Sequence, residues 1–299
     1  MPDIIKVKDV TKDYGGGKGI FNMEFSVKQG EVFGIVGTNG SGKTTTLRHL
    51  MGFISPDSGS CSIMGMDCRK KSAEIMKKVG YVPGEIDFPD VGSGISFLKI
   101  QAGLMGLRDF SRTDRLIDMF KIDASAPLKR MSKGMKQKTA LVCAFMGSPD
   151  IYLLDEPSTG LDPLMRDTLI ELILEEKKRG ATVVMSSHIF KEIDDTCDRV
   201  MFIENGRRLD IVDKAKYEAE TPGIYRIGFM SQEDCERFVD STSFRISRSN
   251  IQCRHADLVE DSGRVSEMMS ELSDFRIRYM KYRPATLETL CSSELSSVK

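Results

Sequence analysis

The stretch GTNGSGKT, residues 37–44, restricts the fold of this chain more than any other feature. It matches the pattern GxxxxGK[ST], and it lies between an apolar run, EVFGIVG, and a helix-like run, TTTLRHLM. In that setting the glycines let backbone N–H groups turn toward a phosphate, and the helix N-terminus adds positive potential. The alternative is a glycine-rich turn with a surface lysine, which the flanking strand and helix disfavour.

Each residue of this loop is therefore a candidate for contact with a nucleotide. Lys43 is expected to reach the β- and γ-phosphates, and the hydroxyl of Thr44 is expected to bind Mg²⁺. The predicted nucleotide-contacting residues of the loop are Gly37, Thr38, Asn39, Gly40, Ser41, Gly42, Lys43, Thr44 and Thr45.

Strand-like and helix-like segments alternate over residues 1–212, which predicts an α/β fold. The runs at 31–37, 151–155 and 181–187 are almost continuously apolar, as buried parallel strands are. Residues 161–180 carry the capping residues of a helix, so the last two strands and this helix form a βαβ unit. Residues 93–145 read as mostly helical, and we place a helical insertion at about 86–148. Two further strands, at 4–10 and 21–27, alternate apolar and polar residues.

A second domain is predicted after a break near 218–223, which gives domains at 1–217 and 218–299. Its pattern is βαββαβ, the order of a ferredoxin-like α+β domain. The expected strands are 225–229, 244–247, 251–256 and 275–282, and the expected helices are 231–240, 263–272 and 285–295.

Composition excludes several other classes of protein. The net charge of −1 gives no general reason to expect a nucleic-acid partner. The seven cysteines include no CxxC pair, so we expect neither a disulfide scaffold nor a structural metal, and we expect a reducing compartment. The N-terminus lacks the apolar region of a signal peptide, and no apolar run approaches the ~18 residues that span a bilayer. Any membrane role is thus expected to come through a partner.

Two adjacent carboxylates end the apolar strand in IYLLDEPSTGLDP, residues 151–163. Asp155 is the candidate ligand of Mg²⁺, and Glu156 is the candidate base that takes a proton from an attacking water. A charged loop after a core strand is the alternative, and the phosphate loop upstream makes it less favoured.

The stretch MSKGMKQK, residues 131–138, concentrates positive charge in a near-neutral chain, and no acidic residue occurs from Ala124 to Pro149. Ser132 is a good N-cap, and its hydroxyl together with the N–H of Gly134 would form a second anion site at a helix N-terminus. Two anion sites on one rigid domain favour head-to-tail pairing of two copies. The alternative is an ordinary capped surface helix.

These motifs, followed by MSSHIF (185–190), occur in the order found in the ATPase subunits of ABC transporters, which residues 3–212 resemble. The resemblance implies the P-loop ABC ATPase fold with an antiparallel β subdomain, ATP and Mg²⁺ as ligands, a second cassette, and a polytopic membrane subunit. It also implies that Tyr14 stacks on adenine, that His188 contacts the γ-phosphate beside the catalytic Glu156, and that MSKGMKQK is the signature usually written LSGGQ. A chain of this kind is expected to be cytoplasmic and peripheral at the inner face of the cell membrane.

The chain also departs from the family pattern. The family has a glutamine after a strand such as VGYVP, but Gly84 stands here, followed by Glu85, which is either a substitute oxygen ligand or a solvated charge. Lys133 and Met135 replace the glycine and glutamine of the signature. GYVPGE, SKGMKQK and RPATLETL together resemble exporter cassettes of the multidrug, antibiotic-resistance or lantibiotic-immunity kind. A soluble ABC protein that acts on ribosomes or nucleic acid is the alternative, and a non-ABC P-loop kinase is a third reading that the signature and His188 disfavour.

Overall fold

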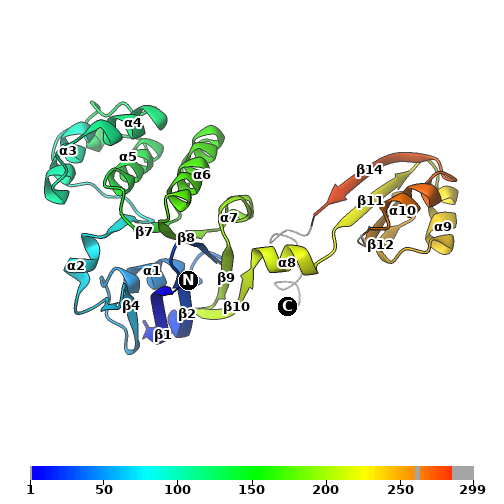
Figure 1. Cartoon of the computed structure of the whole chain (residues 1–299), viewed down its shortest axis with the longest axis horizontal. Helices are drawn as coiled ribbons and strands as arrows, with labels where there is room; N and C mark the ends of the chain where they lie inside the picture. Colours follow the sequence, from blue (N-terminus) through cyan, green and yellow to red (C-terminus); the bar gives the residue numbers. More distant parts are fainter. Residues whose placement is uncertain (1, 260–262, 285–299) are drawn as a thin grey trace. The chain divides into compact units, whose positions relative to one another are not determined.

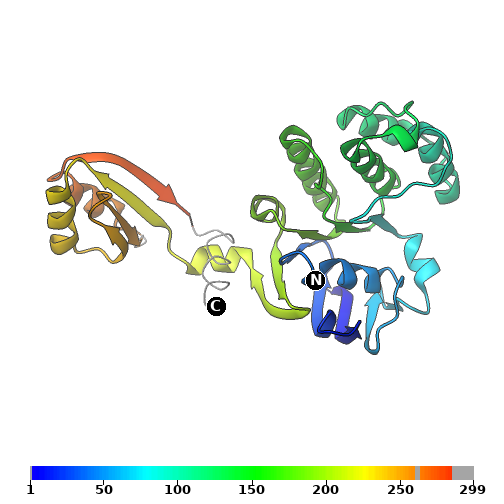
Figure 2. The ribbon, with the colours of Figure 1, turned by 180° about the vertical axis from the view of Figure 1, so that it is seen from behind.

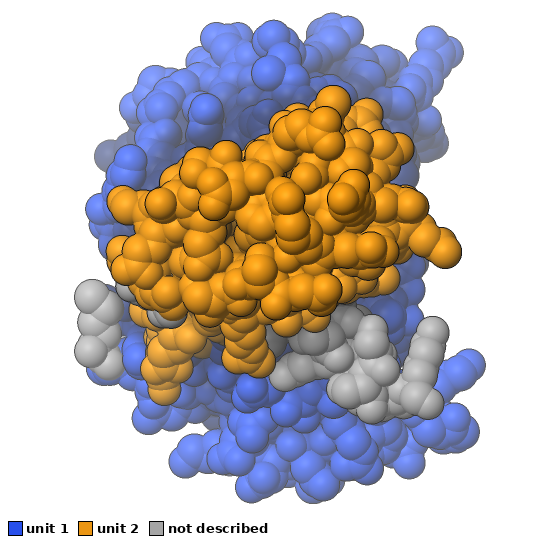
Figure 3. All heavy atoms as spheres, turned by 90° about the vertical axis from the view of Figure 1, so that its right-hand side faces the viewer, with its two compact units in different colours: residues 1–212 blue, residues 213–299 orange. Residues whose placement is uncertain are grey.

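The computed structural model describes residues 2–259 and 263–284, which form two compact units, Met1–Val212 and Asp213–Lys299 (Figure 3). The boundary lies five residues before the expected start of the second domain at 218. A short helix, α8 (Lys214–Glu220), covers part of the stretch that the sequence marked as a break. No helix among the described residues is long and apolar enough to cross a membrane.

The larger unit is built on a six-stranded sheet whose strands follow the order β10-β9-β3-β8-β7-β6. Strand β3 pairs in parallel with both β8 and β9, and β7 pairs in parallel with β6 and β8. All residues of β3, β7 and β8 are buried, as their apolar sequences require. The strands are β3 (Val32–Val36), β6 (Val79–Val82), β7 (Ile151–Asp155), β8 (Thr182–Ser187), β9 (Arg199–Glu204) and β10 (Arg207–Asp213).

A smaller antiparallel sheet packs on one side of this layer and forms the expected β subdomain. Its order is β2-β1-β4-β5, with bounds β1 (Asp3–Asp13), β2 (Gly19–Lys28), β4 (Ser58–Ile63) and β5 (Met66–Asp67). One apolar core joins it to helix α1 (Lys43–Leu50) and to the parallel sheet. Phe25 of β2 and Phe33 of β3, for example, stack with ring centroids 5.4 Å apart. Helices α5 and α6 cover the opposite side (Figures 1 and 2).

The helical insertion contains α3 (Gly94–Met105), α4 (Ser111–Met119), a 3-10 turn (Leu128–Arg130) and α5 (Lys133–Phe145). Helix α2 (Ser72–Met76) precedes it, and α6 (Pro163–Lys178) and α7 (Phe190–Thr196) follow. Arg112 of α4 donates to the carbonyl of Phe145 and to the buried carboxylate of Glu176 on α6. Tyr152 of β7 donates to the same carboxylate at 2.7 Å. One buried acid therefore ties the insertion to the strand that ends at Asp155.

The smaller unit contains a four-stranded antiparallel sheet, order β12-β13-β11-β14, which packs against two helices. The strands are β11 (Ile224–Phe229), β12 (Ile246–Asn250), β13 (His255–Val259) and β14 (Ile277–Arg283), and the helices are α9 (Gln232–Ser241) and α10 (Val265–Leu272). Strands β12 and β13 begin later than expected because residues 251–254 form a turn, in which Arg254 has φ 58°. The expected helix at 285–295 lies outside the described residues.

Candidate active site

The loop between β3 and α1 has a shape that only glycine permits at two positions. A Cβ on Gly37 would lie 2.2 Å from the carbonyl oxygen of Ile203. Gly42 has φ 110°, and a Cβ there would lie 2.7 Å from a methyl group of Ile20. No side chain caps the N-terminus of α1, so its first N–H groups remain available to an anion.

Lys43, the first residue of α1, is 5% exposed and points back along the loop. Its Nζ donates to the carbonyl oxygens of Gly37 and Thr38 at 2.8 and 3.1 Å, and it lies 3.2 Å from Oε1 of Glu156. A flexible ammonium held by loop carbonyls and one carboxylate can exchange those partners for phosphate oxygens.

Asp155 ends β7 and is fully buried. Its Oδ1 accepts a 2.6 Å hydrogen bond from Ser186, whereas Oδ2 has no hydrogen-bond partner in the structure. Burial of a bare carboxylate oxygen is unfavourable unless a cation or donor meets it. Gly84 lies next to that oxygen, and a Cβ on Gly84 would be only 2.8 Å from Oδ2. The oxygen donors here fit a hard divalent cation.

Glu156 follows Asp155 with φ 49°, a conformation that is rare for residues other than glycine and is often retained at active sites. Its N–H donates to the carbonyl and the hydroxyl of Ser186, at 3.2 and 2.9 Å. Its side chain contacts two cation-forming groups: Oε1 lies near Lys43, and Oε2 contacts Nδ1 of His188. His188 itself is half-exposed. The backbone turn thus places the carboxylate between the phosphate loop and the histidine.

A cavity of about 790 Å³ brings most of the predicted residues together. Tyr14 stands at one part of its wall with 55% of its surface exposed, as an open aromatic platform would be. The predicted residues that line the cavity are Tyr14, Asn39, Gly40, Gly42, Lys43, Thr44, Thr45, Glu85, Glu156 and His188. Those that do not line it are Gly37, Thr38, Ser41, Ser132, Gly134 and Asp155.

The N-terminus of α5 lies beside the loop that follows Glu156. The hydroxyl of Ser132 accepts a hydrogen bond from the N–H of Met135 at 3.3 Å, so Ser132 is the N-cap of this helix. A Cβ on Gly134 would lie 2.6 Å from the carbonyl oxygen of Gly160, so the two backbones are in direct contact. Lys133 lines the cavity, although its neighbours Ser132 and Gly134 do not.

Sequence reasoning missed four residues of the cavity wall: Lys18, Gly19, Arg48 and Thr159. Arg48 follows Thr44 by four residues on α1, so helical periodicity could have placed both on one face. Nearby, burial and the charge of Asp155 raise the pKa of Tyr81 to about 12, while Arg48 acts in the opposite direction. Lys18 and Gly19 reach the cavity wall because of the way the loop after Tyr14 folds, and no sequence motif specifies that conformation.

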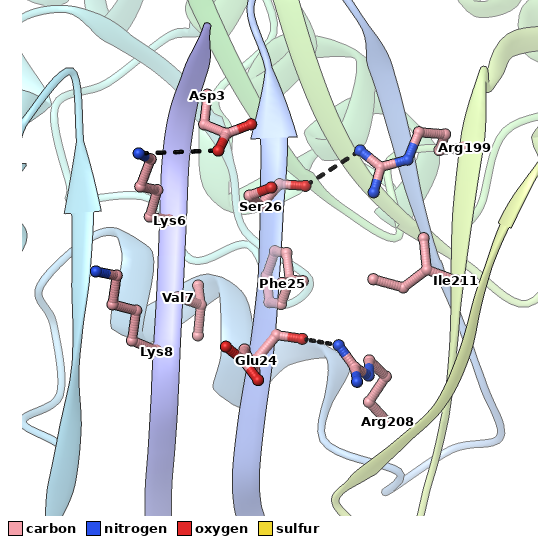
Figure 4. Close-up of a pocket in the computed structure, with 10 residues that line it drawn as sticks. All are labelled: Asp3, Lys6, Val7, Lys8, Glu24, Phe25, Ser26, Arg199, Arg208 and Ile211. Carbon is pink, nitrogen blue, oxygen red and sulfur yellow. Dashed lines mark hydrogen bonds and ion pairs between the residues drawn. The ribbon is translucent and has the colours of Figure 1, made fainter.

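A second hollow of about 400 Å³ lies on the outer side of β1 and β2 (Figure 4). Arg199 donates to the carbonyl of Ser26, and Arg208 donates to the carbonyl of Glu24. Lys6 lies 3.8 Å from a carboxylate oxygen of Asp3. Because three of its four cationic side chains are engaged by the protein itself, this hollow is a poorer candidate for a phosphate.

Comparison with known proteins supports the resemblance that the motifs indicate. The ABC transporter family model matches residues 20–159. The bacitracin transport ATP-binding protein BcrA of Bacillus licheniformis is 34% identical over 216 residues, which cover 70% of each chain. The Nod factor export ATP-binding protein I of Burkholderia orbicola is 34% identical over 211 residues, 69% of each chain. A solved ATP-binding subunit of an ABC transporter superposes with a TM-score of 0.66 at 30% identity, covering 73% of this chain and 92% of its own.

Proposed function

This chain belongs to the ATP-binding, ATP-hydrolysing subunits of ABC transporters, and we propose that it drives export through a separate membrane-spanning subunit. Two of its relatives are named for bacitracin transport and Nod factor export, which favours export over import. The contacts of Glu156 with both Lys43 and His188, at the cavity that the phosphate loop lines, are the observation that best supports hydrolysis at this place.

In the proposed mechanism, Tyr14 stacks on adenine and the loop 37–45 surrounds the phosphates. Lys43 exchanges its loop carbonyls for phosphate oxygens, and Glu156 accepts the proton of the attacking water. His188 holds the Glu156 carboxylate in place and contacts the γ-phosphate. Thr44 and Asp155 would hold Mg²⁺, which neutralises charge on the phosphates when it is bound.

Each reaction centre is proposed to need two copies of the chain. Ser132 and Gly134 are absent from the cavity wall of their own chain, so a phosphate that they bind is expected to belong to a partner cassette. Closure of two cassettes on two ATP molecules would then be stabilised because only the closed state makes these contacts. We expect the partner to be an identical chain.

The membrane subunit is proposed to dock on the helical insertion. Ile100, Leu104 and Met105 on α3 are 47%, 77% and 47% exposed, and together they form an apolar strip of the kind that contacts partners.

The smaller unit is proposed to be a ferredoxin-like accessory domain. Its elements follow the order βαββαβ, and β12 and β14 are the edge strands of its sheet.

The variant Glu156→Gln tests the proposal because it removes the base without removing the nucleotide contacts. ATP binding should persist, hydrolysis should fall by about 10²-fold or more, and ATP should trap a dimer that light scattering detects. The parent protein with ADP is the control and should stay monomeric. Unchanged hydrolysis in the variant would remove Glu156 from the mechanism.

A further inference from the structure

A two-residue link joins the end of β8 to α7, and His188 lies in it. The hydroxyl of Ser187, the residue before His188, donates to Oε2 of Glu192 at 2.9 Å. The same hydroxyl accepts a hydrogen bond from the N–H of Ile189, the residue after His188, at 3.0 Å. The residues on both sides of His188 are therefore tied to one carboxylate through one hydroxyl group.

Glu192 lies on α7 and is 2% exposed. Its Oε1 lies 3.0 Å from Nε of Arg166, in an ion pair that lacks the direction of a hydrogen bond. Arg166 belongs to the first turn of α6, where its N–H donates to the carbonyl of Asp162 at 3.0 Å. A buried carboxylate is stable only when charges and hydrogen bonds compensate it. Ser187 and Arg166 thus hold Glu192 at the point where β8, α6 and α7 meet.

The imidazole of His188 depends on this anchor because packing alone does not fix it. Half of its side chain is exposed, and its Nδ1 contacts Oε2 of Glu156. The backbone from which a half-exposed ring projects decides whether such a contact is kept. Within the described residues, Glu192 forms no hydrogen bond or ion pair with His188 or Glu156, so any effect of Glu192 on them passes through Ser187.

We propose that Glu192 is a positioning residue for ATP hydrolysis: through Ser187 it fixes the backbone of His188, so that the imidazole stays against the Glu156 carboxylate. This inference rests on the proposed function, in which Glu156 is the base and His188 contacts the γ-phosphate. A misplacement of about 1 Å at a reacting centre lowers rates by up to about 100-fold. A hydrogen bond that touches neither the nucleotide nor the attacking water can therefore control the rate.

Two variants loosen this anchor in different ways. Ser187→Ala removes the bridging hydroxyl, and Glu192→Gln keeps the shape of the side chain but removes its charge toward Arg166. Thr196→Val is the matched control, because the Thr196 hydroxyl is also buried but donates to the backbone carbonyl of Glu192, at 2.6 Å. Steady-state ATPase measurements give kcat and KM for each full-length variant, and circular dichroism checks that each one folds.

Both variants should lower kcat about tenfold and leave KM for ATP within about twofold, because the loop 37–45 is untouched. Thr196→Val should change neither constant. In a chain that already carries His188→Ala, adding Ser187→Ala should lower kcat by less than about twofold, since the two residues act as one unit. A further tenfold loss in that background would overturn the inference, and so would an unchanged kcat in both single variants.

Nuclear magnetic resonance of carbon-labelled histidine rings gives a readout that does not depend on turnover. The chain has three histidines, and the signal of His188 is the one that His188→Ala removes. Ser187→Ala and Glu192→Gln should move this signal toward its position in Glu156→Ala, where the contact with Glu156 is absent, and Thr196→Val should leave it in place. A His188 signal that keeps its parent position in both variants contradicts the proposal. If His188→Ala hydrolyses ATP as fast as the parent, the role of His188 in the proposed function fails instead, and the ring signal still decides whether Glu192 positions it.

Discussion

The replacement Gly84→Ala tests how closely the loop after β6 constrains the carboxylate of Asp155, the proposed metal ligand. The added Cβ would lie 2.8 Å from Oδ2 of Asp155, and an ordinary contact needs about 3.4 Å. Either the loop or the carboxylate must therefore move by roughly 0.6 Å. Asp155 is fully buried and bonded to Ser186 at 2.6 Å, so it has little room to retreat without strain.

Overpacking of this kind typically costs about 1–3 kcal/mol, which denaturant unfolding would measure. The effect on function should be larger, since a displacement of up to 1 Å at a reacting centre lowers rates by about 10- to 100-fold. We expect the Mg²⁺ concentration at half-maximal ATPase activity to rise, while nucleotide binding without Mg²⁺ stays near its original value. Manganese binding followed by electron paramagnetic resonance provides a readout that does not depend on turnover.

Gly103→Ala is the matched control, because a Cβ there meets nothing within 4 Å and the residue lies inside helix α3. That change should leave Mg²⁺ dependence unchanged and stabilise the chain slightly, by about 0.5–1 kcal/mol. If Gly84→Ala and Gly103→Ala gave the same Mg²⁺ dependence and the same rate, the assignment of Asp155 Oδ2 to the metal would be refuted.

Two further predictions concern the adenine platform and the buried acid. Tyr14→Ala should weaken ATP and ADP binding alike, by about 1 kcal/mol because the ring is half-exposed, and Tyr14→Phe should restore it; titration calorimetry measures both. An unchanged affinity would exclude the stacking role. Burial raises the pKa of Glu176, but hydrogen bonds from Tyr152 and Arg179 and the charge of Arg112 outweigh it, so the pKa is lowered below its ordinary 4.5. The resulting stability is present above that value and is lost as the pH falls through the lowered pKa. Glu176→Gln should therefore destabilise the chain by about 3 kcal/mol at pH 7 and by clearly less at pH 3, as measured by urea unfolding; an equal loss at both pH values would show that the charge is not what matters.

The strands and helices of the α/β core were predictable because the polarity of each segment matches its burial in the structure. The runs at 151–155 and 181–187 are almost continuously apolar, and the structure buries every residue of β7 and β8. Asp162 accepts a hydrogen bond from the N–H of Met165, and Pro163 begins α6, as the capping pattern indicates. The family assignment from the motifs is confirmed by the relatives at 34% identity.

Other features depend on contacts that no local pattern encodes. Strands β12 and β13 are displaced because Arg254 takes a left-handed turn, and Ile251 packs on the core from that turn rather than from a strand. The closeness of Gly84 to Asp155 joins two strands that are separated by about 70 residues of sequence. The sequence showed that a glutamine was missing there, but only the three-dimensional structure shows that a Cβ at this position would lie 2.8 Å from Oδ2 of Asp155.

The backbone contact between Gly134 and Gly160 has a mechanical consequence. Because neither residue has a side chain that could rotate away, the backbone of the helical insertion and the backbone of the loop after Glu156 touch directly and cannot move toward each other independently. A displacement of the insertion would therefore be passed to the loop that follows Glu156, the proposed base, and a nucleotide bound beside Glu156 would displace the insertion through the same contact.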